Sequence, residues 1–163
     1  KLKTKLFLLD LNKEMLMEGK KRLRKEKNIS YIIGNAEKLN FENNFFDKYL
    51  ISFCLRNVTE HKLSIEEAYR VLKPGGKFCC LEFSHPQSSL ISKTYKIYKS
   101  KILPLMGDIV AKDKNAYKYL GESIDLFPSQ QELSLLINKC GFTKVKYINL
   151  FNGIVTIHTG YKI

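Results

Sequence analysis

The sequence lacks several features that would assign it to a common functional class. None of its 163 residues belong to an apolar run near the roughly 18 residues of a membrane-spanning helix, so the sequence offers no candidate for one. Nucleic-acid recognition favours arginine forks and basic stripes flanked by aromatic residues. The net charge of +12 therefore does not by itself indicate a nucleic-acid partner, because the 28 basic residues include few arginines: Arg22, Arg24, Arg56 and Arg70.

Cysteine and histidine show no metal-ligand spacing. The three histidines do not cluster in sequence with the four cysteines, and Cys79 and Cys80 are neighbours on an expected strand, where their side chains point to opposite faces. This pattern argues against a metal site. It favours reduced thiols in an intracellular or organellar setting. The residues concerned are Cys54, Cys79, Cys80, Cys140, His61, His85 and His158.

Length and composition predict one domain, residues 1–163, with a substantial core and an ordinary hydrophobic content of 44%. The first ten residues, KLKTKLFLLD, resemble a strand and carry no signal-peptide pattern, so we expect the chain to begin inside a domain. The basic run KKRLRKEK, residues 20–27, is predicted to be a solvated helix end, with contact to an anionic membrane surface as the alternative.

Short apolar strands alternate with helical patterns along the chain, which predicts an α/β fold with a mostly parallel sheet. Two final strands joined by Asn152-Gly153 predict an antiparallel hairpin. The expected helix at 61–72 is stopped by the KPGG segment, residues 73–76. The strands are expected at 6–9, 29–33, 48–55, 77–83, 143–151 and 154–162, and the other helices at 12–26, with Asn12 as cap, and 129–139, with a Ser129–Glu132 capping box.

Residues 87–128 break this rhythm. They carry tyrosines at positions 95, 98, 117 and 119 among mixed apolar residues, without a strand pattern. We expect a helical insert of two or three helices above the sheet, serving as a lid and substrate region. A packed helical appendage without substrate contact is the alternative.

Polar residues follow the expected strands at the edge where parallel sheets bind ligands. The Asp10 carboxylate suits the two hydroxyls of a ribose, or it caps the following helix. Asn35 and the backbone of Ala36 suit an adenine edge, or they serve turn chemistry. Together these residues indicate a nucleotide-like ligand.

Six segments carry a resemblance to a known family, the ubiquinone/menaquinone biosynthesis C-methyltransferases. LRNVT and LEFS are the most specific parts of it, while the KPGG glycines occur in many methyltransferases. The match covers nearly the whole chain. The segments are Asp10 in LLDLNKEML, Asn35-Ala36-Glu37, SFCLRNVT, YRVLKPGGKFCCLEFS, KYLGESI and the closing GIVTIHTGYK.

The resemblance implies a Rossmann-like class I fold and S-adenosylmethionine-dependent methylation of a ring carbon of a polyprenylated benzoquinol. It implies that Asp10 binds the ribose of the cofactor, that Asn35 and Ala36 lie at the adenine, and that Ser52 lies near the methionine portion. No metal is required.

The resemblance also points to Arg56 and Asn57 as catalytic residues. An always-charged guanidinium would stabilise a ring phenolate, or orient a water that takes its proton. The alternative is that Arg56 pairs with Glu82 or Glu122 and only shapes the site. Asn57 would position the same oxygen or brace the loop. Weaker candidates for proton relay are Glu122, Tyr119 and His85.

One departure from the family concerns its first central strand and Gly-rich loop, which should precede Lys1 and are missing from the given chain. We expect their loss to expose two strand edges. The chain alone is then expected to bind the cofactor weakly and to be inactive.

Other readings stay open. They are methylation of a naphthoquinol in menaquinone biosynthesis, another class I methyltransferase with a small acceptor, and a non-catalytic membrane-associated scaffold. A nicotinamide-dependent oxidoreductase shares the ribose-binding carboxylate, but the terminal hairpin argues against it. The family implies peripheral association with the mitochondrial inner membrane on its matrix side, or a bacterial cytoplasm. It is compatible with a homodimer or a quinone-biosynthesis complex. It implies no nucleic-acid partner.

Overall fold

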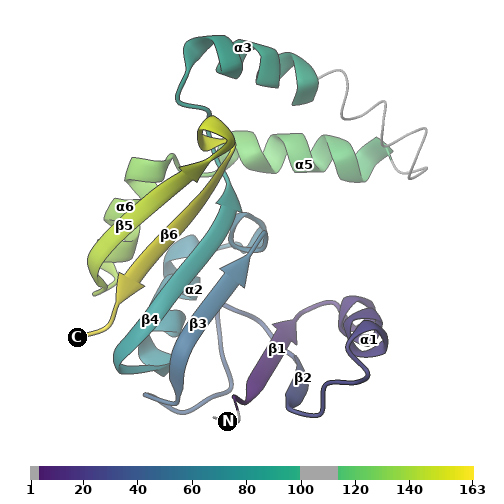
Figure 1. Ribbon diagram of the computed structural model, residues 1–163, viewed down its shortest axis with the longest axis vertical. Coiled ribbons are helices and arrows are strands. Elements are labelled where there is room, and N and C mark those ends of the chain that lie inside the picture. Colours follow the sequence, from purple (N-terminus) through teal and green to yellow (C-terminus); the bar gives the residue numbers. More distant parts are fainter. Residues whose placement is uncertain (1–3, 100–113) are drawn as a thin grey trace.

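The strands form two separate sheets. In the computed structural model, which describes residues 4–99 and 114–163, a parallel pair lies beside a four-stranded sheet of order β3-β4-β6-β5 (Figure 1). Consequently β1 and β3 are both edge strands among the described residues, and two exposed strand edges are what the sequence predicted. The strands are β1 (Leu6–Asp10), β2 (Ile29–Ile33), β3 (Phe46–Ser52), β4 (Leu72–Phe83), β5 (Thr143–Leu150) and β6 (Val155–Tyr161).

A cluster of four phenylalanines joins the two sheets. The ring of Phe7, from β1, lies edge-on to Phe46, at the start of β3, with 5.4 Å between ring centroids. Phe41 and Phe45 stand 5.7 and 5.8 Å from Phe7 in the same edge-to-face arrangement. Edge-to-face ring pairs add to the stabilisation gained from burial, so this cluster compensates in part for the absence of hydrogen bonds between β1 and β3.

Helix α1 (Lys13–Arg22) packs on β1 and β2 and begins where the sequence predicted. The side chain of Asn12 accepts hydrogen bonds from the backbone N–H groups of Glu14 (2.8 Å) and Met15 (3.0 Å). The helix ends four residues earlier than predicted, because Leu23 leaves helical geometry. Residues 20–27 are almost wholly exposed, in agreement with a solvated helix end.

The hydrophobic core lies under one face of the four-stranded sheet. Helix α2 (His61–Val71) packs on β4, helix α6 (Gln130–Lys139) packs on β5 and β6, and the two helices contact each other. Along β4, Phe78, Cys80 and Glu82 are buried toward these helices, whereas Cys79 on the opposite face is half-buried. The expected alternation of the two cysteines is thus confirmed.

The KPGG segment belongs to β4, which differs from the connector that the sequence predicted. The N–H of Gly75 donates to the Lys162 carbonyl (2.7 Å), and the N–H of Lys162 donates to the Gly76 carbonyl (3.1 Å). These bonds continue the β4–β6 ladder as far as Gly75, and the pairing of Leu72 with Phe46 of β3 carries β4 back to Leu72, with a register shift that absorbs the extra residues.

The predicted hairpin is present, and its turn has a second role. Phe151, Asn152 and Gly153 all adopt positive φ, at 48°, 58° and 92°. A Cβ at Gly153 would stand 2.9 Å from the carbonyl oxygen of His85, so only glycine fits there. The Asn152 carbonyl accepts the N–H of Gln87 (2.9 Å), which ties the hairpin to the start of the insert.

The insert contributes helices α3 (Ser89–Ile97) and α5 (Lys114–Leu126), which lie beyond the carboxyl ends of β3 and β4 (Figure 1). The nearly buried Lys99 forms an ion pair with Asp125, which connects the end of the first helix to α5. Residues 100–113 of the predicted insert lie outside the described residues. Within the part of the chain that the structure describes, no helix has the length and apolar character needed to cross a membrane.

A buried histidine makes the fold sensitive to acid. His158 on β6 donates a hydrogen bond from Nε2 to the Gln130 carbonyl (3.0 Å), and burial lowers its pKa below the ordinary 6.5. The unfolded chain therefore binds a proton more readily than the folded one, so stability is complete above about pH 6.5 and is lost as the pH falls below it. Between about pH 7.5 and about pH 5.5, we expect this group to lower the free energy of unfolding by at most about 1.4 kcal/mol per pH unit. The thermal midpoint should fall over the same pH range.

Calorimetry of His158→Gln checks this result, since glutamine keeps a donor without titrating. The variant's midpoint should depend less on pH in this range. An undiminished dependence would assign the effect to other groups, such as His61, whose pKa burial also lowers.

Candidate active site

Three of the predicted cofactor residues lie at one edge of the fold. Asp10 ends β1, Asn35 follows β2 and Ser52 ends β3, and Figure 1 shows β1 and β3 running in the same direction. One carboxylate oxygen of Asp10, Oδ1, accepts the N–H of Asn12 (2.8 Å). The helix cap itself is Asn12, so Asp10 braces the turn with one oxygen and retains the other for a ligand.

Asn35 and Ala36 form a tight turn, as one of the two interpretations predicted. The side-chain oxygen of Asn35 accepts the N–H of Glu37 (2.9 Å), and its carbonyl accepts the N–H of Lys38 (3.1 Å). Since the side-chain oxygen is engaged, the amide –NH₂ of Asn35 is the part that remains to donate to a ligand. Ala36 is buried and Ser52 is exposed.

The Leu-Arg-Asn triplet forms a short 3₁₀ helix, η1 (Leu55–Asn57), directly after β3. Phe53, which precedes it, has φ 52°, an uncommon value for an aromatic residue and one that often marks a functional turn. Leu55 is buried in the core and anchors the triplet. The strand before it is half-exposed, because β3 has no partner on its outer side among the described residues.

Arg56 forms the buried ion pair that the sequence analysis kept as an alternative. Its Nη1 donates to Oε1 of Glu82 (2.8 Å) and to the carbonyl of Phe53 (2.6 Å), and its guanidinium lies 5.4 Å from the centre of the Phe83 ring. The side chain of Arg56 is 10% exposed. Its Nε is buried and has no hydrogen-bond partner among the described residues. A buried polar group without a partner is costly.

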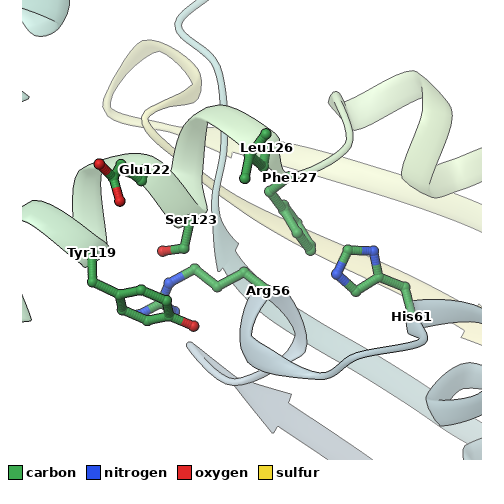
Figure 2. Close-up of a pocket in the computed structure, with 7 residues that line it drawn as sticks. All are labelled: Arg56, His61, Tyr119, Glu122, Ser123, Leu126 and Phe127. Atoms are coloured by element: carbon green, nitrogen blue, oxygen red, sulfur yellow. The ribbon is translucent and has the colours of Figure 1, made fainter.

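A cavity of about 190 Å³ adjoins Arg56, between η1 and the start of α2 on one side and α5 on the other (Figure 2). In Figure 2 the side chains of Arg56 and Tyr119 overlap in the view, and those of His61 and Phe127 lie toward the opposite end of the pocket. Its walls combine one cation, a few polar groups and apolar surface, which is typical of small-molecule sites. The lining residues are Arg56, His61, Tyr119, Glu122, Ser123, Leu126 and Phe127.

Most of the predicted acceptor-side residues meet at this cavity. The hydroxyl of Tyr119 donates to Oδ1 of Asn57 (3.3 Å), which links the 3₁₀ helix to α5. Glu122 also lines the cavity, and its Oε1 lies 3.7 Å from Nζ of Lys118. Glu122 therefore pairs with Lys118, whereas Arg56 pairs with Glu82. His85 is elsewhere: its Nε2 donates to the Phe127 carbonyl (2.9 Å), and the residue lines a separate groove.

Sequence reasoning missed His61, Ser123, Leu126 and Phe127 as cavity residues. Burial lowers the pKa of His61, although a hydrogen bond to the Arg56 backbone opposes this effect, so the ring is neutral near pH 7. Its edge-on contact with the Phe127 ring, at 5.2 Å, closes one end of the cavity. For Ser123, its position next to Glu122 in KYLGESI was the available signal. The places of His61, Leu126 and Phe127 in the cavity depend on how α5 docks.

No group of three or more histidine, cysteine or acidic side chains suited to a metal ion occurs within residues 4–99 and 114–163.

Comparison with known proteins decides the family. The model of the ubiE/COQ5 methyltransferase family matches residues 1–162, which is almost the whole chain. The chain belongs to this family. As a member of the ubiE/COQ5 family it is 47% identical to the mitochondrial 2-methoxy-6-polyprenyl-1,4-benzoquinol methylase of Gallus gallus, over 98% of this chain and 52% of that protein. It is 49% identical to the ubiquinone/menaquinone biosynthesis C-methyltransferase UbiE of Rickettsia prowazekii, over 97% of this chain and 65% of that protein. The chain thus spans about half to two-thirds of the length of these relatives.

Solved structures agree on the fold. A SAM-dependent methyltransferase of Thermotoga maritima superposes with a TM-score of 0.71 at 21% identity, over 99% of this chain and 74% of that one. The [4+2]-cyclase SpnF reaches 0.70 at 13% identity, over 97% and 66%. The ubiE/COQ5 chain therefore has the class I methyltransferase fold, as predicted. Because a cyclase shares it, the fold alone does not fix the reaction.

Proposed function

We propose that this chain is the main part of an enzyme that methylates a ring carbon of a polyprenylated benzoquinol in ubiquinone biosynthesis, with S-adenosylmethionine as methyl donor. Its relatives' names support the reaction class. The observation that carries the proposal is the nearly buried Arg56, which lines a small cavity and whose guanidinium is held in place by Glu82. Such a group suits an acceptor that gains negative charge on an oxygen during the reaction.

Arg56 would act on the hydroxyl beside the acceptor carbon. A phenolic hydroxyl has a pKa of about 10, so its loss of a proton near neutral pH needs a stabilising cation. Arg56 cannot take that proton itself, since its own pKa is above about 12; the proton leaves to water. Asn57 does not itself line the cavity; held by the Tyr119 hydroxyl, it would brace the loop that carries Arg56.

The cofactor residues fit the expected ligand in their donors and acceptors. Asp10 retains one oxygen for the ribose, Asn35 retains its –NH₂ for the adenine, and the exposed Ser52 faces solvent at the end of β3. When bound, S-adenosylmethionine supplies an activated methyl group: a carbon–carbon bond forms as the sulfur–methyl bond breaks, the electron pair stays on sulfur, and one proton is released from the acceptor overall. These residues bind and orient; they take no part in the transfer.

The size of the cavity supports a single ring. Cavities of about 150 Å³ accept benzene, so a cavity of about 190 Å³ is large enough for a substituted benzene ring. The tail would leave beside Leu126, which is 85% exposed and also lines an open groove of about 670 Å³ between α5 and α6. The insert, residues 87–128, would thereby serve as the substrate region.

The proposed acceptor has an apolar tail that resides in a membrane, so the enzyme must work at a membrane surface. The net charge of +12 would assist contact with anionic lipids. The mitochondrial relatives support the matrix side of the inner membrane, and the bacterial relatives support a cytoplasmic site. A homodimer or a complex of quinone-biosynthesis proteins is the assembly that this placement would favour.

The activity is tested in the extended enzyme, which we define as this chain preceded by the first strand and Gly-rich loop that the family implies. With methyl-labelled S-adenosylmethionine, we expect transfer to a reduced, short-tailed benzoquinol at a kcat/KM at least about tenfold above that for the corresponding naphthoquinol, since a site shaped around one ring positions a larger ring less well. Mass spectrometry of the product locates the new methyl group on carbon.

Equal or faster transfer to the naphthoquinol would make menaquinone biosynthesis the better assignment. Cofactor binding without transfer to either quinol would leave another small acceptor. If the extended enzyme neither binds the cofactor nor transfers methyl groups, the proposal is wrong and a scaffold role gains support.

A further inference from the structure

Glu82, on β4, is a buried carboxylate that accepts hydrogen bonds from Arg56 and Phe83. Its side chain is 1% exposed. Oε1 accepts Nη1 of Arg56 (2.8 Å) and the N–H of Phe83 (2.9 Å), and Oε2 is 3.3 Å from the backbone nitrogen of Arg56. Buried carboxylates are found almost only where they are paired, so Glu82 is fixed by its own environment before any ligand binds.

This arrangement fixes the direction of the Arg56 side chain. Glu82 and the Phe53 carbonyl both receive Nη1, and the Phe83 ring lies beside the guanidinium. An arginine usually rotates freely about several bonds and loses considerable entropy when it is ordered. Here that cost is met in the folded protein, because Nη1 is already engaged where the Arg56 side chain lines the cavity.

The pair is also neutral as a whole. A lone buried guanidinium would attract any permanent anion, whereas a guanidinium beside a carboxylate has no net charge. Such a pair suits a ligand that binds as a neutral hydroxyl and becomes anionic only as the reaction proceeds, because interactions that strengthen in the transition state are the ones that raise kcat.

We propose that Glu82 is a positioning residue for methyl transfer: it holds the guanidinium of Arg56, through Nη1, in the orientation in which the group meets the acceptor oxygen at the cavity. This inference rests on the proposed function. Glu82 does not touch the acceptor and acts only through Arg56.

The test compares Glu82→Gln in two backgrounds of the extended enzyme. In the native background we expect kcat to fall about 10²-fold with the KM for S-adenosylmethionine within about twofold, as for loss of one oriented donor. In the Arg56→Ala background the same change should alter kcat less than about threefold, because residues that act as a unit are non-additive. An equal loss in both backgrounds, or no loss in the native one, overturns the proposal.

The chain supplies a matched control. Glu67 forms a second, partly buried pair with Arg70 on α2 (2.6 Å), and neither residue lines the cavity. Glu67→Gln removes a similar ion pair and should leave kcat within about twofold. A loss in Glu67→Gln as large as that in Glu82→Gln would show a general structural effect and overturn the specific role.

A second readout does not depend on the reaction. In nitrogen-15 NMR of the extended enzyme, the Nε–H proton of Arg56 should exchange with water at least about tenfold faster in Glu82→Gln than in the native protein or in Glu67→Gln. Unchanged exchange refutes the positioning role. If exchange responds but no quinol is methylated, the proposed function fails while the positioning of Arg56 by Glu82 stands.

Discussion

Arg56→Ala in the extended enzyme is expected to lower kcat for methyl transfer about 10²- to 10³-fold, the usual cost of removing one donor to a developing oxyanion. The dissociation constant of S-adenosylmethionine should change little, because the predicted cofactor residues lie on β1, β3 and the turn after β2. Single-turnover transfer of a labelled methyl group measures the first quantity, and calorimetric titration measures the second.

The variant's pH profile separates catalysis from structure. Without the cation, transfer depends on the small fraction of acceptor already ionised, so log kcat should rise with a slope near 1 between about pH 7 and pH 9. The native enzyme should show a smaller slope. Parallel profiles in the two proteins would contradict phenolate stabilisation by Arg56.

Two variants guard against misfolding as the cause. Arg56→Ala leaves the Glu82 carboxylate buried without its partner, which is itself destabilising. Arg56→Lys keeps a charge beside Glu82 but lacks the planar fork, so it should fold well and still lose at least about tenfold in kcat. Arg70→Ala removes an arginine from the pair remote from the cavity and should leave kcat within about twofold.

Local chemistry made most of the fold predictable. The capping residue Asn12, the capping box at Ser129 and the Asn152-Gly153 turn each act through neighbours a few residues away, and all three occur as predicted. Boundaries shifted where a distant partner decided them. The KPGG segment joined β4 because Lys162, far along the chain, supplies its hydrogen bonds.

The site was less predictable because its contacts are long-range. The alternation of strands and helices placed Arg56 at a strand end, but whether it paired with Glu82 or Glu122 depended on how α5 docks and on which face of β4 is buried. The structure selects Glu82. His61 and Phe127 are 66 residues apart in sequence and meet only through that docking. The assigned roles of the cofactor residues remain predictions.

Phe78→Ala in this chain is expected to lower the free energy of unfolding by about 3–5 kcal/mol, the usual cost of deleting a buried phenylalanine ring. Phe78 is 1% exposed and lies in the core under β4. Its ring centroid is 4.9 Å from that of Phe142 and 6.0 Å from that of Tyr49. Removing it leaves a cavity that these two neighbours cannot fill, because Tyr49 is fixed on β3 and Phe142 at the junction of α6 and β5. Urea denaturation followed by circular dichroism measures the change.

Phe151→Ala is the matched control, because the same ring is deleted where it is 80% exposed, and the change should be within about 0.5 kcal/mol.

The comparison also shows which part of the chain carries its stability. A domain of this kind is stable by only about 5–15 kcal/mol, so a loss of the expected size at Phe78 means that the four-stranded sheet and its two helices form the cooperative unit. A small loss at Phe78 would instead mean that the packing of β1 and β2 through Phe7 carries more of the fold than the burial of their residues indicates. Since Arg56 and Glu82 both lie on the four-stranded half, the first outcome places the proposed catalytic arginine and its positioning carboxylate within the cooperative unit.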